Sequence, residues 1–342
     1  MNILVCNAQV PFARGGAEML VEGLCNALKR AGHRAEIVAL PFQWLPHAEL
    51  FKSALAWRLL DLKMANGLKV DRIIATKFPS YAAQHPQKIV WLIHQYRQAY
   101  DWYGTPLSEF TASSQDRMTR EKLFSLDRRV LGEAQARFAI SKNVAARLKR
   151  FNALDAIPLY PPPRLAGKFY AGEYGDYALY VGRLDRAKRV ELLLRALAKT
   201  KRGRVVVAGT GLEEQNLKTL AARLGISSRV EFLGFVDDAR VIELYANARA
   251  VFYAPVDEDY GFATVEALMS ARPVITTDDA GGVLEFIENE NDGWVTRADV
   301  DEIALSLTRA FEDIETCRAW GNRGRERVQD IRWDHVVEQL TA

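Results

Sequence analysis

The apolar positions of this chain follow two patterns that alternate along its length. Residues 2–10 form a short, nearly continuous apolar run, which is typical of a strand buried on both faces of a sheet. Residues 17–32 instead repeat apolar positions at helical spacing and end on basic residues and Gly32, a helix stop signal. The alternation continues, and we expect strands over 33–40, 70–76, 88–94 and 137–141 and helices over 53–67 and 142–151.

A proline- and glycine-rich stretch interrupts this alternation near the middle of the chain. Residues 157–177 hold four prolines and three glycines, a density that no regular element tolerates. Beyond it we expect strands over 177–183, 204–210, 229–235, 249–255 and 273–278, and helices over 188–200, 213–225, 239–248, 262–271 and 300–313. The fold class is therefore α/β, with two doubly wound parallel-sheet domains at 1–160 and 177–332 and a linker at 161–176.

Composition supports two globular domains. The chain has 342 residues, of which 49% are hydrophobic and 26% charged, enough for two ordinary cores. No apolar run reaches the roughly 18–20 residues that span a bilayer, and the first residues read as a strand rather than a signal peptide. The three cysteines, Cys6, Cys25 and Cys317, are too few and too scattered for a disulfide framework or a metal site, so we expect a cytoplasmic location.

The two halves differ in charge. Residues 1–165 carry 23 Lys and Arg against 13 Asp and Glu, whereas residues 166–342 carry 23 against 30. A basic first half can meet an anionic partner such as a membrane surface, a phosphorylated lipid or a nucleic acid, although a merely solvated basic face explains it equally well. Within that half, residues 51–69 read as an amphipathic helix. A helix that faces the core is favoured there over one that lies on a membrane.

Chemistry-bearing residues gather at the predicted strand-to-helix turns, where open parallel sheets bind ligands. Gly15 and Gly16 follow the first strand and allow a ligand to approach the backbone at a helix start, although a plain turn is as good a reading. Arg183 and Lys188 flank the turn after residues 177–183, where two cations can neutralise a diphosphate. Because cations oppose the positive end of a helix, this basic turn predicts an anionic ligand.

A third turn places two carboxylates around a glycine, in the sequence EDYGFATVE. The helix predicted to start near Phe262 would point the backbone N–H groups of Gly261, Phe262 and Ala263 at an anion. Glu266 lies in the second helical turn, within reach of vicinal hydroxyls such as those of ribose, and Glu258 precedes the helix. The alternative is that these acidic residues only complement the helix dipole, which is worth about 0.3–1 kcal/mol.

The order of these motifs resembles that of the retaining GT-B glycosyltransferases of family 4, the group 1 glycosyltransferases. The shared features are GGAE, Gly-Arg followed after four residues by Lys, AGTG, FLGFV, and two glutamates separated by seven residues with an internal glycine. The resemblance covers nearly the whole chain and is strongest from Tyr177 to Val295. Tyr260 stands where the family more commonly has Phe, and Asp259 where Pro or Gly is more usual.

The resemblance implies two Rossmann-like domains facing across a cleft, with the donor nucleotide mostly in the C-terminal domain and a tail helix over 333–342 crossing back to the first. Arg183 and Lys188 would hold the donor diphosphate, Glu258 would approach the transferred sugar, and His94 would be the functional histidine that follows an N-terminal strand. The remaining donor-binding residues implied are Gly15, Gly16, Gly209, Gly234, Phe235, Val236, Tyr260, Gly261, Phe262, Ala263 and Glu266.

The function implied is transfer of a hexose-type sugar, with retention, from a UDP- or GDP-linked donor to a glycan or lipid-linked acceptor in polysaccharide or glycolipid synthesis. We expect no cofactor and no metal, because fixed positive charge would neutralise the leaving group. No nucleic-acid partner is expected, and the protein would be cytoplasmic or peripheral at the inner face of the membrane.

Two further points stay open. The aromatic cluster after His94 fits either a sugar-stacking surface or a core; it comprises Tyr96, Tyr100, Trp102 and Tyr103. The alternatives are a non-catalytic nucleotide-sugar-binding subunit and a GT-B sugar-nucleotide epimerase.

Overall fold

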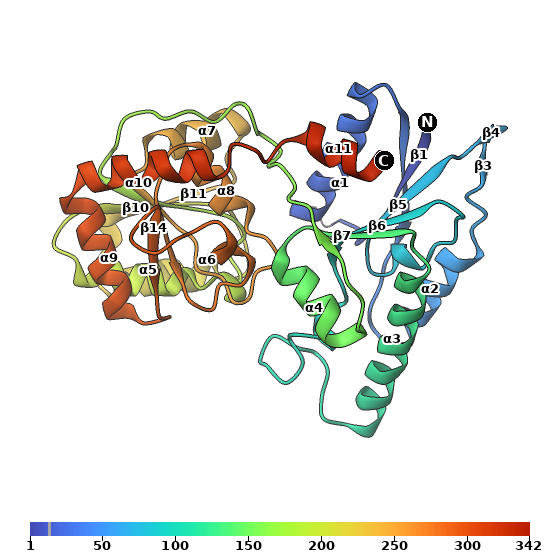
Figure 1. The fold of residues 1–342 in the computed structure, drawn as a ribbon. Coiled ribbons are helices and arrows are strands. Elements are labelled where there is room, and N and C mark those ends of the chain that lie inside the picture. Colours follow the sequence, from blue (N-terminus) through green and yellow to red (C-terminus); the bar gives the residue numbers. More distant parts are fainter. Residues whose placement is uncertain (13–14) are drawn as a thin grey trace. The chain divides into compact units, whose positions relative to one another are not determined.

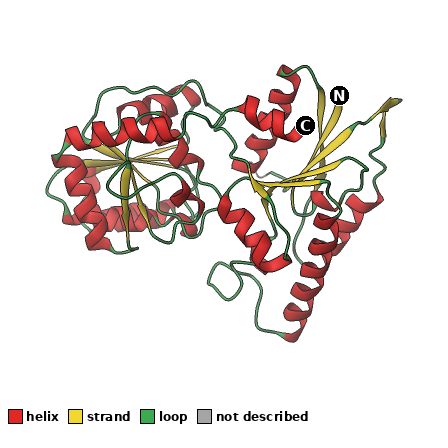
Figure 2. Cartoon of the chain, viewed as in Figure 1, coloured by secondary structure: helices red, strands yellow, loops and turns green. Residues whose placement is uncertain are grey.

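The computed structural model describes residues 1–12 and 15–342, and these form two compact units. One unit comprises Met1–Arg164 together with Ile331–Ala342, and the other comprises Leu165–Asp330. Each is a parallel sheet with helices packed against it (Figures 1 and 2). The predicted α/β class with two doubly wound sheets is confirmed.

The sheet of the N-terminal unit has six strands in the order β2-β1-β5-β6-β7-β8, all paired in parallel. The chain runs from β1 outward to β2 and then returns to the other side of β1, so the strand order reverses between β1 and β5. The strands are β1 (Asn2–Gln9), β2 (Arg34–Pro41), β5 (Arg72–Lys77), β6 (Lys88–His94), β7 (Ala136–Ala139) and β8 (Ile157–Pro158). The helices are α1 (Gly16–Arg30), α2 (Ala48–Leu59), α3 (Ser114–Gly132), α4 (Lys142–Asn152) and α11 (Trp333–Thr341).

The sheet of the C-terminal unit also has six parallel strands, in the order β11-β10-β9-β12-β13-β14. Its strand order reverses between β9 and β12, which is the point where doubly wound sheets open a ligand crevice. The strands are β9 (Tyr177–Val181), β10 (Arg204–Ala208), β11 (Val230–Gly234), β12 (Ala250–Phe252), β13 (Val274–Thr277) and β14 (Gly293–Thr296). The helices are α5 (Val190–Lys199), α6 (Glu214–Arg223), α7 (Asp238–Asn247), α8 (Phe262–Met269), α9 (Val300–Glu312) and α10 (Ile314–Arg327).

The last helix, α11, packs on the N-terminal unit. The Trp333 ring meets the Trp91 ring edge-to-face, with the ring centroids 6.2 Å apart. Gly23 of α1 leaves room for this indole, because a Cβ there would lie 2.6 Å from the Trp333 ring. The Arg72 guanidinium donates to the backbone carbonyls of Leu340 and Ala342, each at 2.8 Å, which fixes the end of the helix to β5.

The segment predicted as a linker is packed against the C-terminal unit from Leu165 onward. The Gly172 and Gly175 amides donate to the carbonyls of Ala246 and Asn247 at 3.0 and 2.9 Å. The fully buried Arg272 lies 3.7 Å over the Tyr174 ring and donates to the Gly172 carbonyl at 2.7 Å. The glycines therefore serve close backbone packing, because a Cβ on Gly172 would lie 2.7 Å from the Ala246 oxygen.

The helix predicted over 53–67 is wrong in its second half. The helix α2 ends at Leu59, and Met64–Ala65 (β3) pairs antiparallel with Leu68–Lys69 (β4). Asn66 and Gly67 have φ of 49° and 76°, the conformation of a two-residue hairpin turn that Asn-Gly strongly favours. The exposed lysines Lys63 and Lys69 consequently belong to a hairpin and not to an amphipathic helix.

The helices α3 and α10 were not predicted. In α3 the buried face includes the polar residues Thr119 and Asp127 beside Leu123, Val130 and Leu131, so its apolar repeat is broken. In α10 the buried residues are Cys317, Gly321 and Gly324, small side chains that carry little hydrophobic signal. Tertiary packing, not a clear apolar stripe, sets both helices.

Asp127 of α3 is a carboxyl group buried in the N-terminal unit. The Tyr100 hydroxyl donates to it at 2.6 Å, and Asn152 contacts Tyr100 in turn at 3.4 Å. Burial raises the pKa of Asp127 to about 7, outweighing the lowering by hydrogen bonds from Tyr100 and Tyr81. The folded state therefore binds the Asp127 proton more tightly than the unfolded state does. The resulting stabilisation of the fold is complete below the unfolded-state pKa of about 4 and is lost as pH rises through 7.

We expect Asp127→Asn to have a higher melting temperature than the wild type at pH 8, because the amide is neutral at every pH. At pH 4–5 the two proteins should differ little or the wild type should be the more stable. Thermal unfolding across this pH range measures the difference. The control is Asp155→Asn, which alters a carboxylate whose side chain is 80% exposed and should show no such pH-dependent gain. A parallel pH dependence for Asp127→Asn and the wild type would contradict the prediction.

Candidate functional site

Two turns of the C-terminal unit meet where its strand order reverses. One follows β9 and carries Arg183 to Arg189, and the other follows β12 and carries Tyr253 to Gly261. The amide of Val256 donates to the carbonyl of Ala187 at 2.8 Å, which joins the turns directly. This is the carboxyl edge of the sheet, where the sequence predicted a site.

Lys188 and Glu258 form an ion pair at this edge. Lys188 is only 9% exposed, and its ammonium group also donates to the Tyr253 hydroxyl at 3.2 Å. A nearly buried ammonium group needs such partners, because its desolvation is otherwise unfavourable. The structure thus brings together two residues that the sequence singled out 70 positions apart.

Tyr253 is a third member of this cluster that sequence reasoning missed. It is buried, and burial raises the pKa of its hydroxyl well above the usual value, so the group stays a neutral hydrogen-bond partner. The signal available in the sequence was a tyrosine, an aromatic with a polar tip, directly after a fully buried strand.

The other cations of the basic turn are matched by carboxylates of the chain. Arg189 donates to both oxygens of Asp279 at 2.7 Å and to the carbonyls of Ala254 and Pro255 at 2.8 Å. Arg186 pairs with Glu213 at 3.3 Å. The inference that a basic turn requires an anionic ligand is therefore wrong for these residues, because protein carboxylates supply the compensation. Arg183 differs: its side chain is 74% exposed and lies 3.8 Å from Asp185.

The loop that carries Glu258 is held by tight backbone packing. The Glu258 amide donates to the Ala280 carbonyl at 3.1 Å, and the Gly282 amide donates to the Glu258 carbonyl at 2.8 Å. A Cβ on Gly282 would lie 2.5 Å from the Asp259 oxygen, so only glycine allows this approach. The Gly281–Gly282 turn thus supports the Glu258 loop.

The helix α8 begins directly after this loop, with Gly261 as its N-cap residue. Gly261 has a φ of 90°, which favours glycine, and a Cβ there would lie 2.7 Å from Val283. Tyr260 and Ala263 are buried, and the Tyr260 ring packs on Phe262 and Phe286 with centroids 4.9 and 5.2 Å away. Because these side chains are buried, the predicted contact of this segment with a ligand would be through the backbone amides at the helix start.

Glu266 lies in the second turn of α8 and is partly exposed. Its Oε2 accepts a hydrogen bond of 2.9 Å from the hydroxyl of Tyr245, a buried residue of α7. Burial, together with the Glu266 charge, raises the pKa of Tyr245 well above the usual value, so this hydroxyl stays a donor. Tyr245 is a positioning residue that the sequence did not reveal.

The glycines after β10 and β11 lie on the same edge of the sheet. A Cβ on Gly209 would lie 1.9 Å from the Gly182 oxygen, so the turns after β9 and β10 touch through their backbones. The Gly209 amide donates to the Gly234 carbonyl at 2.8 Å, and Gly234 has a φ of 66°. The next residue, Phe235, is 85% exposed, and Val236 is partly exposed.

In the N-terminal unit, Gly15 and Gly16 lie at the start of α1, the helix that follows β1. Gly15 caps α1, and its amide donates to Glu18 at 2.9 Å. The other oxygen of Glu18 pairs with the nearly buried Lys77, at the end of β5, at 2.6 Å. His94 is the last residue of β6, is partly exposed, and has its Nδ1 2.8 Å from the Gln95 carbonyl.

The aromatic cluster after His94 divides into two pairs. Tyr96 and Tyr100 are buried and serve the core. Trp102 and Tyr103 are partly exposed, and the guanidinium carbons of Arg97 and Arg120 lie 4.5 and 3.4 Å from their respective ring centroids. The core interpretation therefore holds for Tyr96 and Tyr100, whereas sugar stacking by Trp102 and Tyr103 stays a prediction.

Residues 1–12 and 15–342 contain no group of three or more His, Cys, Asp and Glu side chains arranged to hold a metal ion, although Asp257, Glu258 and Asp259 are consecutive. No helix in this part of the chain is long and apolar enough to cross a membrane.

Residues 170–327 match the family model described as glycosyl transferases group 1. An uncharacterised glycosyltransferase of Methanocaldococcus jannaschii is 31% identical over 172 residues, which cover 47% of this chain and 42% of that protein. A D-inositol 3-phosphate glycosyltransferase of Nocardia farcinica is 30% identical over 173 residues, covering 47% of this chain and 38% of that protein. The chain thus matches less than half the length of these curated relatives.

The fold extends further than the sequence similarity. Sucrose-phosphate synthase from Thermosynechococcus elongatus superposes with a TM-score of 0.76 at 21% identity, covering 100% of this chain and 98% of that one. The Anabaena protein HepE, solved in complex with UDP, gives a TM-score of 0.71 at 19% identity over 100% and 98% of the two chains.

Both units thus have the architecture of the GT-B glycosyltransferases, two Rossmann-like parallel sheets in one chain. Residues 170–327, which lie in the C-terminal unit, match the group 1 glycosyl transferases. This match supports the resemblance to that group drawn from the motifs, whereas the retaining mechanism, the assignment to family 4 and the roles of the individual site residues remain predictions.

We expect Tyr245→Phe to weaken about fivefold the binding of the nucleoside diphosphate, UDP or GDP, that the wild type takes, while leaving the fold intact, because the Glu266 carboxylate would lose the hydroxyl that orients it. Isothermal titration calorimetry measures the dissociation constant. The control is Tyr177→Phe, which removes a hydroxyl bonded to the Leu244 carbonyl at 2.8 Å, next to Tyr245. Equal affinities for Tyr245→Phe and the wild type would show that Tyr245 does not position Glu266 for the ligand.

Proposed function

We propose that this protein is a retaining glycosyltransferase that moves a hexose-type sugar from a UDP- or GDP-linked donor to a glycan or lipid-linked acceptor, in cell-surface polysaccharide or glycolipid synthesis. The observation that carries the proposal is the Lys188–Glu258 pair at the point where the C-terminal strand order reverses. HepE, of similar fold, was solved with UDP, and a Campylobacter jejuni relative of 28% identity is named as an N-acetylgalactosaminyltransferase acting on a diphospho-undecaprenol-linked sugar.

The chemistry proposed is the cleavage of the bond between the anomeric carbon and the donor phosphate. Negative charge develops on the departing nucleoside diphosphate, and Lys188, Arg183 and the amides at the start of α8 would stabilise it. Glu258 already holds Lys188, so a bound diphosphate would share that ammonium group with the carboxylate. Glu258 would then lie beside the transferred sugar, where its charge favours an oxocarbenium-like centre and front-face attack with retention.

The rest of the donor would extend along the same edge of the sheet. Glu266, oriented by Tyr245, would accept hydrogen bonds from the ribose hydroxyls, and the backbone at Gly234 to Val236 would hold the base. The proposal includes no metal, because the cations named above would neutralise the leaving group. In the N-terminal unit, the proposal assigns Gly15 and Gly16 to donor binding and His94 to the reaction, as the family resemblance implies.

We also propose that the protein is cytoplasmic and binds peripherally to an anionic membrane surface through its N-terminal unit. The excess of basic residues in that unit, with Leu55, Leu59 and Met64 exposed between lysines, supports this location. Flotation with anionic but not with neutral liposomes is the expected result. Equal absence from both kinds of liposome would refute membrane binding and leave the transferase proposal untouched.

One of the nucleotides UDP, GDP, ADP and dTDP should raise the melting temperature of the purified protein, with or without EDTA. Ligand at about 100 times its dissociation constant adds roughly 2.7 kcal/mol to the free energy of unfolding, which thermal shift detects readily. The EDTA arm tests the metal-free site directly, since Asp257 and Asp259 flank Glu258. No shift with any of the four nucleotides would favour a non-catalytic subunit.

Thermal shift with the nucleotide and donor turnover should distinguish the cations of the proposed site from a lysine outside it. Lys188→Ala and Arg183→Ala should lose most of the nucleotide shift and of donor turnover, whereas Lys199→Ala, which alters an exposed ion pair at the end of α5, should keep both. Wild-type behaviour in Lys188→Ala and Arg183→Ala would refute the assignment. Formation of free sugar or of an epimer without any acceptor would instead support the epimerase alternative.

A further inference from the structure

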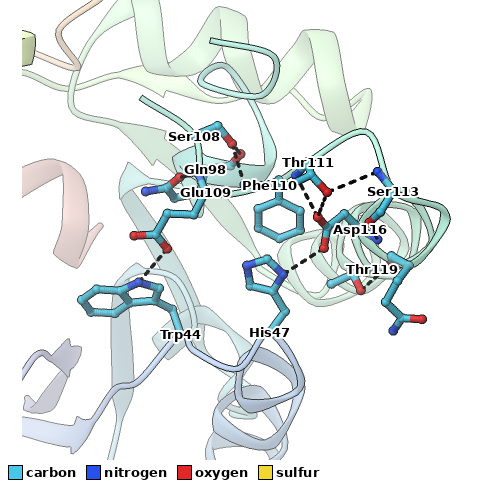
Figure 3. A network of polar contacts seen from close by, with 11 residues as sticks. Trp44, His47, Gln98, Ser108, Glu109, Phe110, Thr111, Ser113, Asp116 and Thr119 are labelled. Carbon is cyan, nitrogen blue, oxygen red and sulfur yellow. Dashed lines mark hydrogen bonds and ion pairs between the residues drawn. The ribbon is translucent and has the colours of Figure 1, made fainter. Parts of the chain in front are cut away.

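Two loops of the N-terminal unit are joined by a polar network at the carboxyl ends of their strands (Figure 3). One loop follows β2 and contains Trp44 and His47, and the other follows β6 and runs to the start of α3. The His47 ring stacks on Phe110, with centroids 3.9 Å apart and planes at 8°, and lies 3.2 Å from Asp116. Asp116 also accepts from the Thr111 amide at 2.7 Å, so the two loops have a fixed relative position.

Trp44, Gln98 and Glu109 lie on the side of this network away from Asp116 (Figure 3). The Trp44 indole donates to Glu109 Oε2 at 2.9 Å, and the Glu109 amide donates to the side-chain carbonyl of Gln98 at 2.6 Å. Glu109 is exposed, and Trp44 and Gln98 are partly exposed. These bonds orient the three side chains and leave the second carboxylate oxygen of Glu109 and the amide nitrogen of Gln98 available to a ligand.

Tyr96 adds a further polar group beside this trio. Its ring is only 8% exposed and packs against Phe42 and Phe110, with both centroids 6.2 Å away. Its hydroxyl has no hydrogen-bond partner within residues 1–12 and 15–342. Phe42 also packs on the Trp44 ring, with the centroids 6.2 Å apart, and burial and, second, the charge of Glu109 raise the pKa of Tyr96, so its hydroxyl stays protonated.

This combination suits a neutral ring that carries hydroxyl groups. An indole face takes the apolar C–H face of a sugar, while a carboxylate oxygen accepts from hydroxyls and an amide N–H donates to them. The Glu109 carboxylate disfavours a phosphate group at the same place, and its exposed charge disfavours an acyl chain. Both loops also lie at the edge of the N-terminal sheet where parallel sheets bind ligands.

We propose that Trp44, Gln98 and Glu109 form a binding site for a hexopyranose ring of the glycosyl acceptor. The acceptor role rests on the proposed transferase function, whereas the binding of a sugar by these residues does not. The three side chains share one ring: Trp44 packs on its face, and Glu109 and Gln98 bind its hydroxyls.

Saturation-transfer difference NMR of the whole protein with methyl glucopyranosides, galactopyranosides and mannopyranosides tests the site. Excess UDP in every sample occupies the proposed nucleotide site. We expect at least one glycoside to bind the wild type with a dissociation constant below ~20 mM, and Trp44→Ala to weaken it about tenfold. Trp44→Phe should keep most of the affinity because an aromatic face remains, and Glu109→Gln should weaken binding about fivefold although the amide still accepts from Trp44.

This series separates ligand binding from a purely structural role. If the Trp44–Glu109 bond only joined the loops, Trp44→Phe would be as harmful as Trp44→Ala, and Glu109→Gln would have no effect. Met118→Ala, on the exposed surface of α3, and Lys199→Ala, at an exposed ion pair of the other unit, are the controls and should bind as the wild type does. The proposal is refuted if no glycoside binds or if the Trp44 and Glu109 variants bind normally. Failure of the transferase proposal shows separately, as the lack of any nucleotide shift.

Discussion

A lysine ammonium group removed from water must have a compensating partner, and the Lys188–Glu258 pair meets this requirement in the C-terminal unit. The pair forms because the strands β9 and β12 are neighbours in the sheet although β10 and β11 lie between them in the chain. Their turns consequently meet edge to edge. The loop that carries Glu258 is then fixed by Gly261 and Gly282, where no larger residue fits. The conformation of the Glu258 loop, the two glycines that allow it and the burial of Lys188 are all consistent with keeping these two charges together.

The need to compensate charge also explains how the basic turn after β9 can precede the start of α5. Cations near the N-terminus of a helix are unfavourable, and Arg186 and Arg189 are stabilised there by Glu213 and Asp279. Arg183 makes a longer contact than Arg186 or Arg189, because its nitrogen lies 3.8 Å from the Asp185 carboxylate. A ligand phosphate thus gains most from Arg183 and from a share of Lys188, while Arg186 and Arg189 keep the turn in place.

The N-terminal unit uses charge pairing in a similar way, at the reversal of its own strand order. Glu18, in the first turn of α1, accepts from the Gly15 amide with one carboxylate oxygen and pairs with Lys77, at the end of β5, through the other. Farther along the same edge, His47, Phe110 and Asp116 join the loops after β2 and β6. Fixed loops at a strand edge can present side chains with little loss of conformational entropy on binding, which is the common physical basis of both proposed sites.

The sequence by itself determined the elements whose cause is local. Continuous apolar runs gave the buried strands, helical spacing gave α1, α5 and α9, and the order of the motifs pointed to the family. It did not determine features that depend on distant partners: the hydroxyls of Tyr253 and Tyr245 beside Lys188 and Glu266, or the carboxylates that pair with Arg186 and Arg189. The helix α3 was missed because Thr119 and Asp127 occupy its buried face, and the hairpin after α2 because the apolar spacing outweighed the Asn-Gly turn signal. Periodicity is a property of neighbouring residues, whereas burial and pairing depend on which strands lie side by side, and only the tertiary structure decides that.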